Sequence, residues 1–236
     1  MTITEANVVG EVVATDYRAA TIFKAHKIDF CCNGNRTISD VCAGKDLRPD
    51  QLIDELEKAI STKEKQTADF QSWDADLLAD YIEKKHHRYV AEKIPELRFY
   101  LKKVAKVHGL LHPELIKIEQ LFLDSSYELL AHMKKEEMIL FPFVRAVADK
   151  PSTPQAPFGS VQNPIRMMMH EHDTEGERFR KIAELSDNYT PPADACTTYK
   201  VAFAMLQEFE EDLHLHIHLE NNILFPKALA SESQMN

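Results

Sequence analysis

The chain contains an internal repeat that limits the folds open to it. A histidine, a glutamate four residues later and an Ile-Leu-Phe-Pro segment occur together twice. The matching residues, each displaced by 84 positions, are His132, Glu136 and 139–142 in one copy and His216, Glu220 and 223–226 in the other. His87 and His172, upstream of the two copies, are displaced by 85 positions. The repeat predicts two helical hairpins, and because neither can bury its apolar stripe alone, it predicts that they pair in a four-helix bundle.

The hydrophobic pattern gives the bundle approximate boundaries within an all-α chain. Apolar residues recur at helical spacing, only six glycines occur in 236 residues, and no segment shows sustained strand-like alternation. The predicted bundle helices cover residues 74–107, 113–148, 162–187 and 194–230. The first of them is predicted to be continuous, and Pro95 is where a break would be expected if it were not. We assign residues 73–232 to the bundle and residues 1–65 to a small N-terminal helical domain, joined by a polar linker.

Charge and composition narrow the classes of partner and compartment. The formal charge of −10 disfavours a nucleic-acid partner, because an acidic chain repels phosphate backbones. No apolar stretch is long enough to cross a bilayer, which predicts no membrane association. The N-terminal segment lacks a basic start and carries Glu5 and Glu11, so it is a poor secretory signal. We therefore expect a cytoplasmic protein whose four cysteines are reduced thiols.

The repeated His-x-x-x-Glu pairs are typical of a metal site inside a bundle. Residues four apart lie on one helix face, and apolar residues surround both pairs, so the pairs should face inward. A buried carboxylate without a partner is very costly, and a cation removes that cost. The six candidate ligands are His87, His132, Glu136, His172, His216 and Glu220. Four imidazoles and two carboxylates could give each of two metals two histidines and a share of two bridging glutamates.

This ligand set predicts two non-haem iron ions joined by an oxo or hydroxo bridge, with one coordination position left for a ligand. Manganese and zinc also suit imidazole and carboxylate ligands. The alternative is that the pairs are ordinary solvated helix residues. One pair alone would favour that alternative, whereas two copies in one register, each followed by Ile-Leu-Phe-Pro, argue against it.

Helix geometry ranks the remaining histidines. His87 and His132 lie about 23 and 22 residues from a turn near 110–111, so a rise of about 1.5 Å per residue puts them at one level. His108 lies about 32 Å further along the same helix and is expected at the hairpin turn with His112. We expect the others to be surface or supporting residues: His86, His170, His214 and His218.

A pair of adjacent cysteines, Cys31 and Cys32, lies in a loop at residues 29–35. Their Cα atoms are about 3.8 Å apart, below the usual disulfide range, so a bond between them would be strained. They could be soft metal ligands or redox thiols. The alternative that they are two small apolar side chains in a minor core stays open. Cys42 and Cys196 have no partner spacing and are expected to be structural.

These motifs together resemble one family. They are Asp29-Phe-Cys-Cys-Asn-Gly34, the two His-x-x-x-Glu segments with their Leu-Phe-Pro endings, Glu171-His-Asp173 and Pro191-Pro-Ala-Asp-Ala-Cys-Thr-Thr198. The combination resembles the repair-of-iron-centres (RIC) family, of the ScdA/YtfE type, along nearly the whole chain. The His-x-x-x-Glu segments alone would indicate only a hemerythrin-like domain. One departure is Asn33, where a glycine is common in the family.

The resemblance implies a hemerythrin-like di-iron bundle that repairs iron-sulfur clusters damaged by nitric oxide or oxidants, by supplying iron. It implies that Cys31 and Cys32 take part in the transfer and that Glu128 and Glu171 line a path to the irons. The expected partners are damaged iron-sulfur proteins, with nitric oxide or oxygen as ligands of the irons. The expected assembly is a monomer or a homodimer.

Two other classes of function stay open from the sequence. An oxygen carrier or a sensor of oxygen or nitric oxide needs the open metal position but not the cysteine pair. An enzyme that reduces nitric oxide or detoxifies nitrite or peroxide needs an electron donor, and the sequence contains no flavin or haem motif. Whether the chain is an enzyme is therefore not decided by its sequence.

Overall fold

The computed structural model describes residues 2–61, 68–149 and 159–233, and this part of the chain is helical apart from its turns and one isolated bridge between Val8 and Thr37. The N-terminal unit contains α1 (Val9–Thr15), α2 (Ala19–Ala25), α3 (Ile38–Ala43) and α4 (Pro49–Ser61). A 3-10 turn at Phe70–Ser72 leads into the bundle. The bundle contains α5 (Ala75–Tyr81), α6 (Arg88–His108), α7 (Glu114–Lys135), α8 (Phe141–Asp149), α9 (Gln162–Leu185), α10 (Thr197–Leu219) and α11 (Phe225–Ser233).

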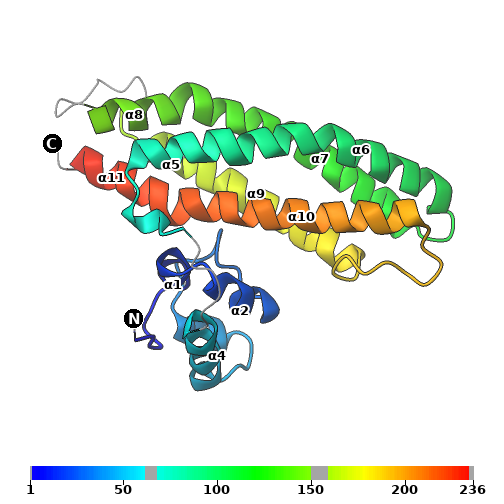
Figure 1. Cartoon of the computed structure of the whole chain (residues 1–236), viewed down its shortest axis with the longest axis horizontal. Helices are drawn as coiled ribbons and strands as arrows, with labels where there is room; N and C mark the ends of the chain where they lie inside the picture. The colour runs from blue at the N-terminus through cyan, green and yellow to red at the C-terminus, as the bar shows by residue number, and fades with distance from the viewer. Residues whose placement is uncertain (1, 62–67, 150–158, 234–236) are drawn as a thin grey trace.

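The predicted all-α fold with a four-helix bundle is confirmed (Figure 1). Three of the four bundle helices are continuous pairs joined by π-helical turns at Ile82–His87, Glu136–Leu140 and Glu220–Leu224. The first helix runs unbroken through Pro95. Helix α6 packs against α7 and α10, and α7 packs against α9. The loop predicted at 149–161 falls largely on residues 150–158, outside the described residues.

Two apolar clusters fill the bundle on either side of a buried polar layer. One cluster includes Val90 and Leu129, and the other includes Ile82 and Leu140. On α5–α6 and on α7–α8, the candidate ligands therefore lie between a residue of one cluster and a residue of the other. Burial of this apolar surface stabilises the fold and fixes the depth of the polar layer along the bundle.

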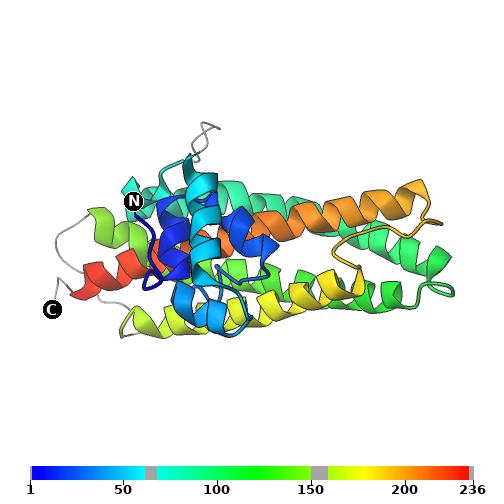
Figure 2. The ribbon, with the colours of Figure 1, turned by 90° about the horizontal axis from the view of Figure 1, so that it is seen from below.

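The N-terminal unit packs on the side of the bundle formed by α9 and α10 (Figure 2). Arg180 of α9 pairs with Asp29 at 2.8 Å, and Lys24 of α2 pairs with Glu211 of α10 at 3.2 Å. Buried residues of the unit belong to the same apolar cluster as residues of the bundle. The domain boundaries at 65 and 73 stay a prediction, and residues 62–67 of the linker lie outside the described residues.

The sequence did not predict α3. Thr37 caps this helix: its hydroxyl accepts a hydrogen bond from the backbone N–H of Asp40 at 3.1 Å, and the Asp40 carboxylate accepts one from the Thr37 backbone N–H at 3.2 Å. This capping box was the available sequence signal.

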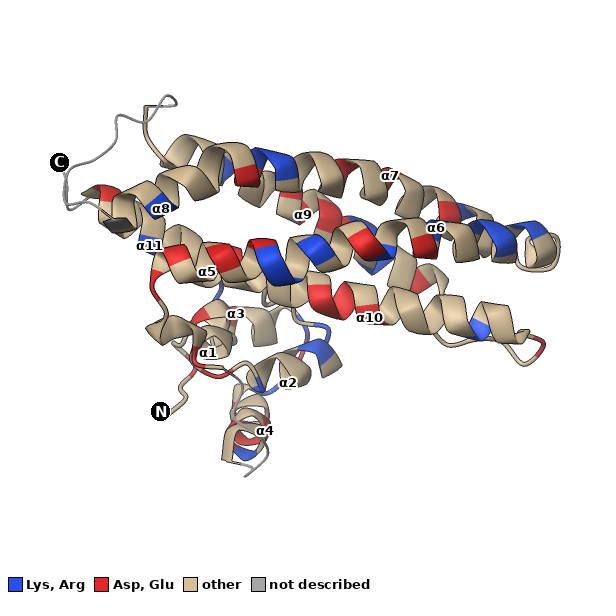
Figure 3. Ribbon diagram, turned by 45° about the horizontal axis from the view of Figure 1, so that its top comes forward, with Lys and Arg blue, Asp and Glu red and all other residues tan. Residues whose placement is uncertain are grey.

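Charged residues of both signs follow one another along α6, and acidic residues gather in the middle of α10 (Figure 3). Among the described residues, no helix combines the length and hydrophobicity needed to span a membrane.

Candidate metal centre

The six candidate ligands meet inside the bundle, and the π-helical turns position three of them. His87 is the last residue of one turn, and Glu136 and Glu220 are the first residues of the other two. A π-helical turn widens the helix locally, and such turns are frequent at functional sites. His172 lies in the regular helix α9.

Glu136 lies between two histidines. Its Oε1 is 3.3 Å from Nε2 of His132, and its Oε2 is 3.4 Å from Nε2 of His87. Glu220 repeats the arrangement, because its Oε1 is 3.1 Å from Nε2 of His216 and its Oε2 is 3.2 Å from Nε2 of His172. Each carboxylate thus directs its two oxygens toward different imidazoles, which is the geometry of a bridging ligand.

Two overlapping groups of ligand atoms result, and both glutamates belong to each. One group contains His87 and His216, and the other contains His132 and His172. Within a group, the ligand atoms lie within 4.8 Å of one another. Each group takes one histidine from each hairpin, so the site is complete only when the hairpins pack together.

The buried polar atoms of the centre fit metal ions. Glu136 and Glu220 are fully buried. Both carboxylate oxygens of Glu136, Oε2 of Glu220 and Nε2 of His87 are buried without a hydrogen-bond partner in the described part of the chain. Since unpaired buried polar groups are costly, these atoms need a cation or protons. Nitrogen and carboxylate oxygen donors in this number suit a divalent transition metal.

In the protein alone, protons on neighbouring imidazoles balance the charge of a buried carboxylate in the centre. Burial lowers the pKa of His132, but Glu136 and Glu171 outweigh it and raise that pKa to about 10. Burial and Glu220 raise the pKa of Glu136, but His132 and His87 outweigh them and leave it below its ordinary value. Around Glu136, His132 and His87 therefore form imidazolium–carboxylate pairs, and a metal that binds there must displace their protons.

Side chains from neighbouring helices hold three of the imidazoles by their second nitrogen. Nδ1 of His87 donates to Glu137 at 3.1 Å, and Nδ1 of His132 donates to Glu171 at 2.7 Å. Nδ1 of His172 donates to Oδ1 of Asn221 at 2.8 Å. Such partners fix the tautomer that leaves Nε2 free to bind a metal.

A cavity of about 230 Å³ reaches the centre from outside the bundle. His132 and His172 line its inner side, and both Glu128 and Glu171 belong to its wall. Glu128 is exposed and pairs with Arg178 at 2.9 Å. The two glutamates proposed to line a path therefore lie in one cavity, which leads to the metal position of His132 and His172.

The other histidines are dispersed, and two of them are more buried than the sequence indicated. His86 is fully buried, donates from Nδ1 to the carboxylate of Asp212 at 3.0 Å and stacks on the ring of His216. His218 is also buried, and burial lowers its pKa to about 3. His170 is exposed and His214 half-buried.

His108 lies at the C-terminal end of α6, as predicted. Its Nε2 is 3.2 Å from Sγ of Cys196, just before α10, and it belongs to neither group of ligand atoms.

The cysteine pair lies beside the centre. Oδ1 of Asp29 accepts hydrogen bonds from the backbone N–H of Cys31 at 3.1 Å and of Cys32 at 3.0 Å. The two Sγ atoms are 3.7 Å apart, and the side chains of the three residues form a further group that could hold a metal. A hydrogen bond with Cys32 and burial raise the pKa of Cys31 well above its ordinary value. Sγ of Cys32 donates to the backbone oxygen of His172 at 3.3 Å.

Sequence reasoning missed Glu137 and Asn221, which support the ligands. Both directly follow a candidate bridging glutamate, 84 positions apart, so the repeat itself was the signal that could have found them. The two residues differ in type, so identity between the copies does not reveal them.

Two family models match the chain. Residues 5–60 match ScdA_N, a domain of unknown function, and residues 78–228 match the hemerythrin HHE cation-binding domain. The iron-sulfur cluster repair protein YtfE of Pectobacterium atrosepticum is 37% identical over 230 residues, covering 94% of this chain and 96% of the relative. YtfE of Escherichia coli O8 is 36% identical over 224 residues, covering 94% and 96%. ScdA of Staphylococcus haemolyticus is 32% identical over 225 residues, covering 95% and 99%. The hemerythrin match spans all six candidate ligands.

Proposed function

Because the chain belongs to the family of YtfE and ScdA iron-sulfur cluster repair proteins, we propose that it restores damaged clusters by supplying iron held between its two helical hairpins. The proposal rests on one observation above all: two groups of buried ligand atoms share Glu136 and Glu220. Two metal positions that share both glutamates can hold a pair of bridged ions, which a purely structural metal site does not need. The clients are iron-sulfur proteins, as the names of the relatives indicate.

We assign iron to both positions. Each position offers two imidazole nitrogens and two carboxylate oxygens, which suits iron, and bundle cores are where carboxylate-bridged di-iron sites are built. Such a site has room for an oxo or hydroxo bridge and for one small ligand. Bound iron would supply both the metal for a client cluster and a binding position for nitric oxide or oxygen.

The cavity that contains Glu128 and Glu171 is the proposed route for small ligands and water. His132, and to a smaller extent Lys135, lower the pKa of Glu171 to about 2 against the opposing effect of burial. Glu171 is therefore ionised at neutral pH and holds the ring of His132 by its Nδ1–H.

Cys31 and Cys32 are the proposed transfer thiols. They lie on the bundle side of the N-terminal unit, and Cys32 contacts the backbone of the candidate ligand His172. Thiolates can hold iron and pass it to a cluster. We place this activity in the cytoplasm, where the four free cysteines stay reduced. Both a monomer and a homodimer remain compatible with it.

Isotope transfer tests the proposal. The protein is loaded with ⁵⁷Fe, its metal content is measured, and it is mixed with a dehydratase whose cluster has been damaged by nitric oxide. We expect the dehydratase to regain activity and its cluster to contain ⁵⁷Fe by Mössbauer spectroscopy. The same amount of free ⁵⁷Fe with a chelator is the control. Restored activity without ⁵⁷Fe in the cluster would reject iron donation.

Binding of oxygen or nitric oxide is the second candidate function, because the cavity opens on one metal position only. It predicts a stable adduct of the loaded protein, with full retention of ⁵⁷Fe, in the same experiment.

A further inference from the structure

Asn221 connects a candidate metal ligand to the loop that carries the cysteine pair. Its Oδ1 accepts the Nδ1–H of His172 at 2.8 Å, and its Nδ2 donates to the backbone oxygen of Cys31 at 3.0 Å. Residues 29–35 are called the thiol loop below. Cys32 adds a second contact, because its Sγ donates to the backbone oxygen of His172. One side chain thus touches both the imidazole that faces the centre and the loop that faces the bundle.

The internal repeat shows what this position does elsewhere in the same fold. In the first hairpin, the residue after the bridging glutamate is Glu137, which accepts the Nδ1–H of His87 at 3.1 Å. A carboxylate suffices there, because the position only has to accept. At the equivalent position of the second hairpin, the side chain accepts from His172 and donates to Cys31. An ionised carboxylate cannot donate, whereas an amide does both.

The chemistry of the ring fixes the direction of the amide. Nε2 of His172 needs a free lone pair to bind a metal, so Nδ1 must carry the hydrogen. Oδ1 of Asn221 then faces the ring, and Nδ2 faces the thiol loop. We propose that Asn221 is a positioning residue that couples the ring of His172 to the thiol loop, so that a filled metal centre holds the loop closed. The inference rests on the proposed metal centre and transfer thiols.

The surroundings leave space for this arrangement. A Cβ at Gly176 of α9 would lie 3.0 Å from Sγ of Cys32, so a larger residue there would press on the thiol. The neighbouring Asn222 also holds the loop, by donating to the backbone oxygen of Phe30 at 3.3 Å. Its amide is 3.1 Å from Nδ1 of His218, which is not a candidate ligand. Asn222 therefore anchors the same loop without touching the centre.

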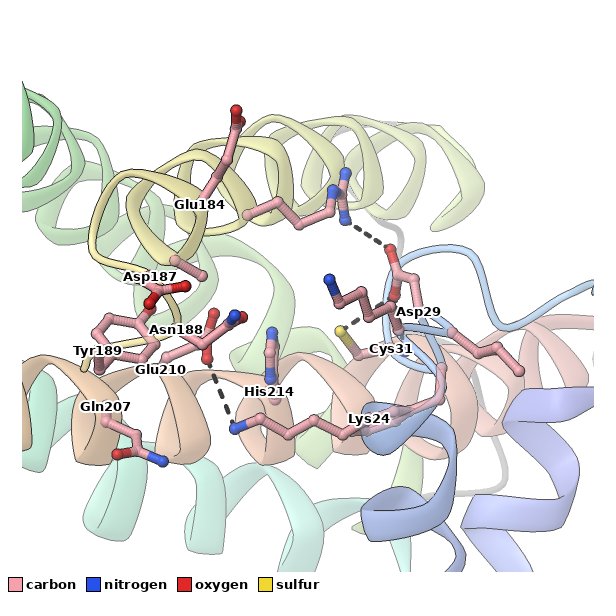
Figure 4. A pocket seen from close by; sticks show the side chains of 15 residues that line it. Lys24, Asp29, Cys31, Glu184, Asp187, Asn188, Tyr189, Gln207, Glu210 and His214 are labelled. Carbon is pink, nitrogen blue, oxygen red and sulfur yellow. Dashed lines mark hydrogen bonds and ion pairs between the residues drawn. The ribbon is translucent and has the colours of Figure 1, made fainter. Parts of the chain in front are cut away.

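The outer side of the loop faces a cavity of about 530 Å³ between the N-terminal unit and the bundle (Figure 4). Cys31, Asp29 and His214 line it together, with Lys24 at its lower edge in the view. Cys31 itself is buried, with 4% of its surface exposed, so a reagent in the cavity reaches the thiol only when the loop opens.

Coupling of this kind is reciprocal. If filling the centre closes the loop, then drawing the loop away from the bundle weakens the hold on the ring of His172 by the same factor. A client that engages the cysteines would thereby loosen the centre from which iron has to leave. Asn221 would make release depend on contact with the client.

Alkylation of the thiols measures loop opening directly. Iodoacetamide is added to the iron-loaded and iron-depleted protein, and modification of Cys31, the buried thiol of the pair, is followed by mass spectrometry. Exposed Cys196 serves as the internal reference thiol. We expect iron loading to slow alkylation of Cys31 about tenfold, a typical coupling between two sites. In Asn221→Asp, the carboxylate still accepts from His172 but repels the backbone oxygen of Cys31. We expect fast alkylation that no longer depends on iron.

Asn222→Asp is the matched control, because it weakens the same loop without contacting a ligand. It should speed alkylation with and without iron but preserve the ratio between them. Equal rates in the loaded and depleted parent protein would overturn the proposal, as would an iron-dependent ratio in Asn221→Asp equal to that of the parent. If the Asn221→Asp variant does not hold iron, its alkylation rate is compared with that of the iron-depleted parent protein. A rate no faster than the parent's also rejects the coupling through Asn221. Failure of ⁵⁷Fe transfer with the ratio intact would reject iron donation but leave the coupling standing.

Discussion

Three of the four imidazoles in the centre are held by a side chain from another helix, and the fourth, His216, is not. Nδ1 of His216 has no hydrogen-bond partner within the described ranges, although its ring stacks on His86. The hydrogen-bonded rings have a fixed tautomer, whereas His216 is held by packing and by Glu220. The two candidate bridging glutamates therefore carry much of the organisation of the proposed centre.

Removing one bridging carboxylate should affect both metals. We expect Glu136→Ala and Glu220→Ala each to lower the iron content from about two per chain to well below one, because each glutamate belongs to both ligand groups. Metal analysis of the purified variants measures this. Glu92→Ala, at an exposed position of α6, is the control and should keep both irons. Retention of both irons in Glu136→Ala and in Glu220→Ala would contradict the ligand assignment.

At the scale of helices, the far end of the bundle is a separate region. The end of α6, the turn after it and the segment before α10 meet there through side-chain contacts of His108 with Cys196 and of His112 with Asp194. Both rings pack near the buried ring of Tyr199. The 21 residues from His87 to His108 span about 32 Å of helix, so this end cannot take part in the metal centre.

We expect His108→Ala to keep the iron content of the parent protein, since α6 is continuous. The lost contact with Cys196 should cost about 1 kcal/mol of unfolding free energy. Metal analysis together with denaturant unfolding checks both parts. Loss of an iron with unchanged circular dichroism would mean that α6 bends back toward the centre in solution.

The same end should show a pH-dependent contribution to stability. Asp194 first, and then Glu114, raise the pKa of His112 above its ordinary value against the opposing effect of desolvation. A raised pKa in the folded state means that the contribution is complete below the unfolded value of about 6.5 and is lost as the pH rises through the folded value. The difference in melting temperature between the parent and His112→Ala should therefore be largest near pH 6 and shrink toward pH 9. A constant difference across this range would show that the ion pairs are not formed.

At the scale of the whole molecule, the N-terminal unit and the bundle have different tasks in the proposed function. The bundle supplies all six candidate ligands, and the unit supplies only the thiol loop. Cys31 and Cys32 are absent from both groups of ligand atoms in the centre. Changing the thiols should therefore leave the centre intact.

The double variant Cys31→Ser with Cys32→Ser should retain about two irons and the visible spectrum of the parent. It should reactivate a nitric-oxide-damaged iron-sulfur enzyme several-fold more slowly, because serine is a poor substitute for a soft thiolate. Rates of reactivation and metal analysis are the measurements. Parent-like reactivation would make the cysteines structural, and loss of iron would place them in the centre.

The sequence predicted the features that follow from helical spacing and from the repeat, but not those that depend on contacts between residues distant along the chain. The bundle and the convergence of the six ligands followed from the repeat, because residues at one spacing on equivalent helices must meet at one level. Burial of His86 and His218 did not follow, since it depends on which elements pack over those faces. The role of Asn221 also required the fold, because its partner Cys31 is 190 residues away along the chain.

The sharing of each metal position between the hairpins has a consequence for the ancestry of the chain. Exchanging the two hairpins converts the pair of His87 and His216 into the pair of His172 and His132. An approximate twofold axis therefore passes between the two candidate metal positions. Two copies of one hairpin, related by that axis, would offer a full ligand set. The present chain has the form expected from tandem duplication of a gene for a self-pairing hairpin. Glu137 and Asn221 occupy equivalent positions in the two copies, and Asn221 adds a contact with the N-terminal unit through Cys31.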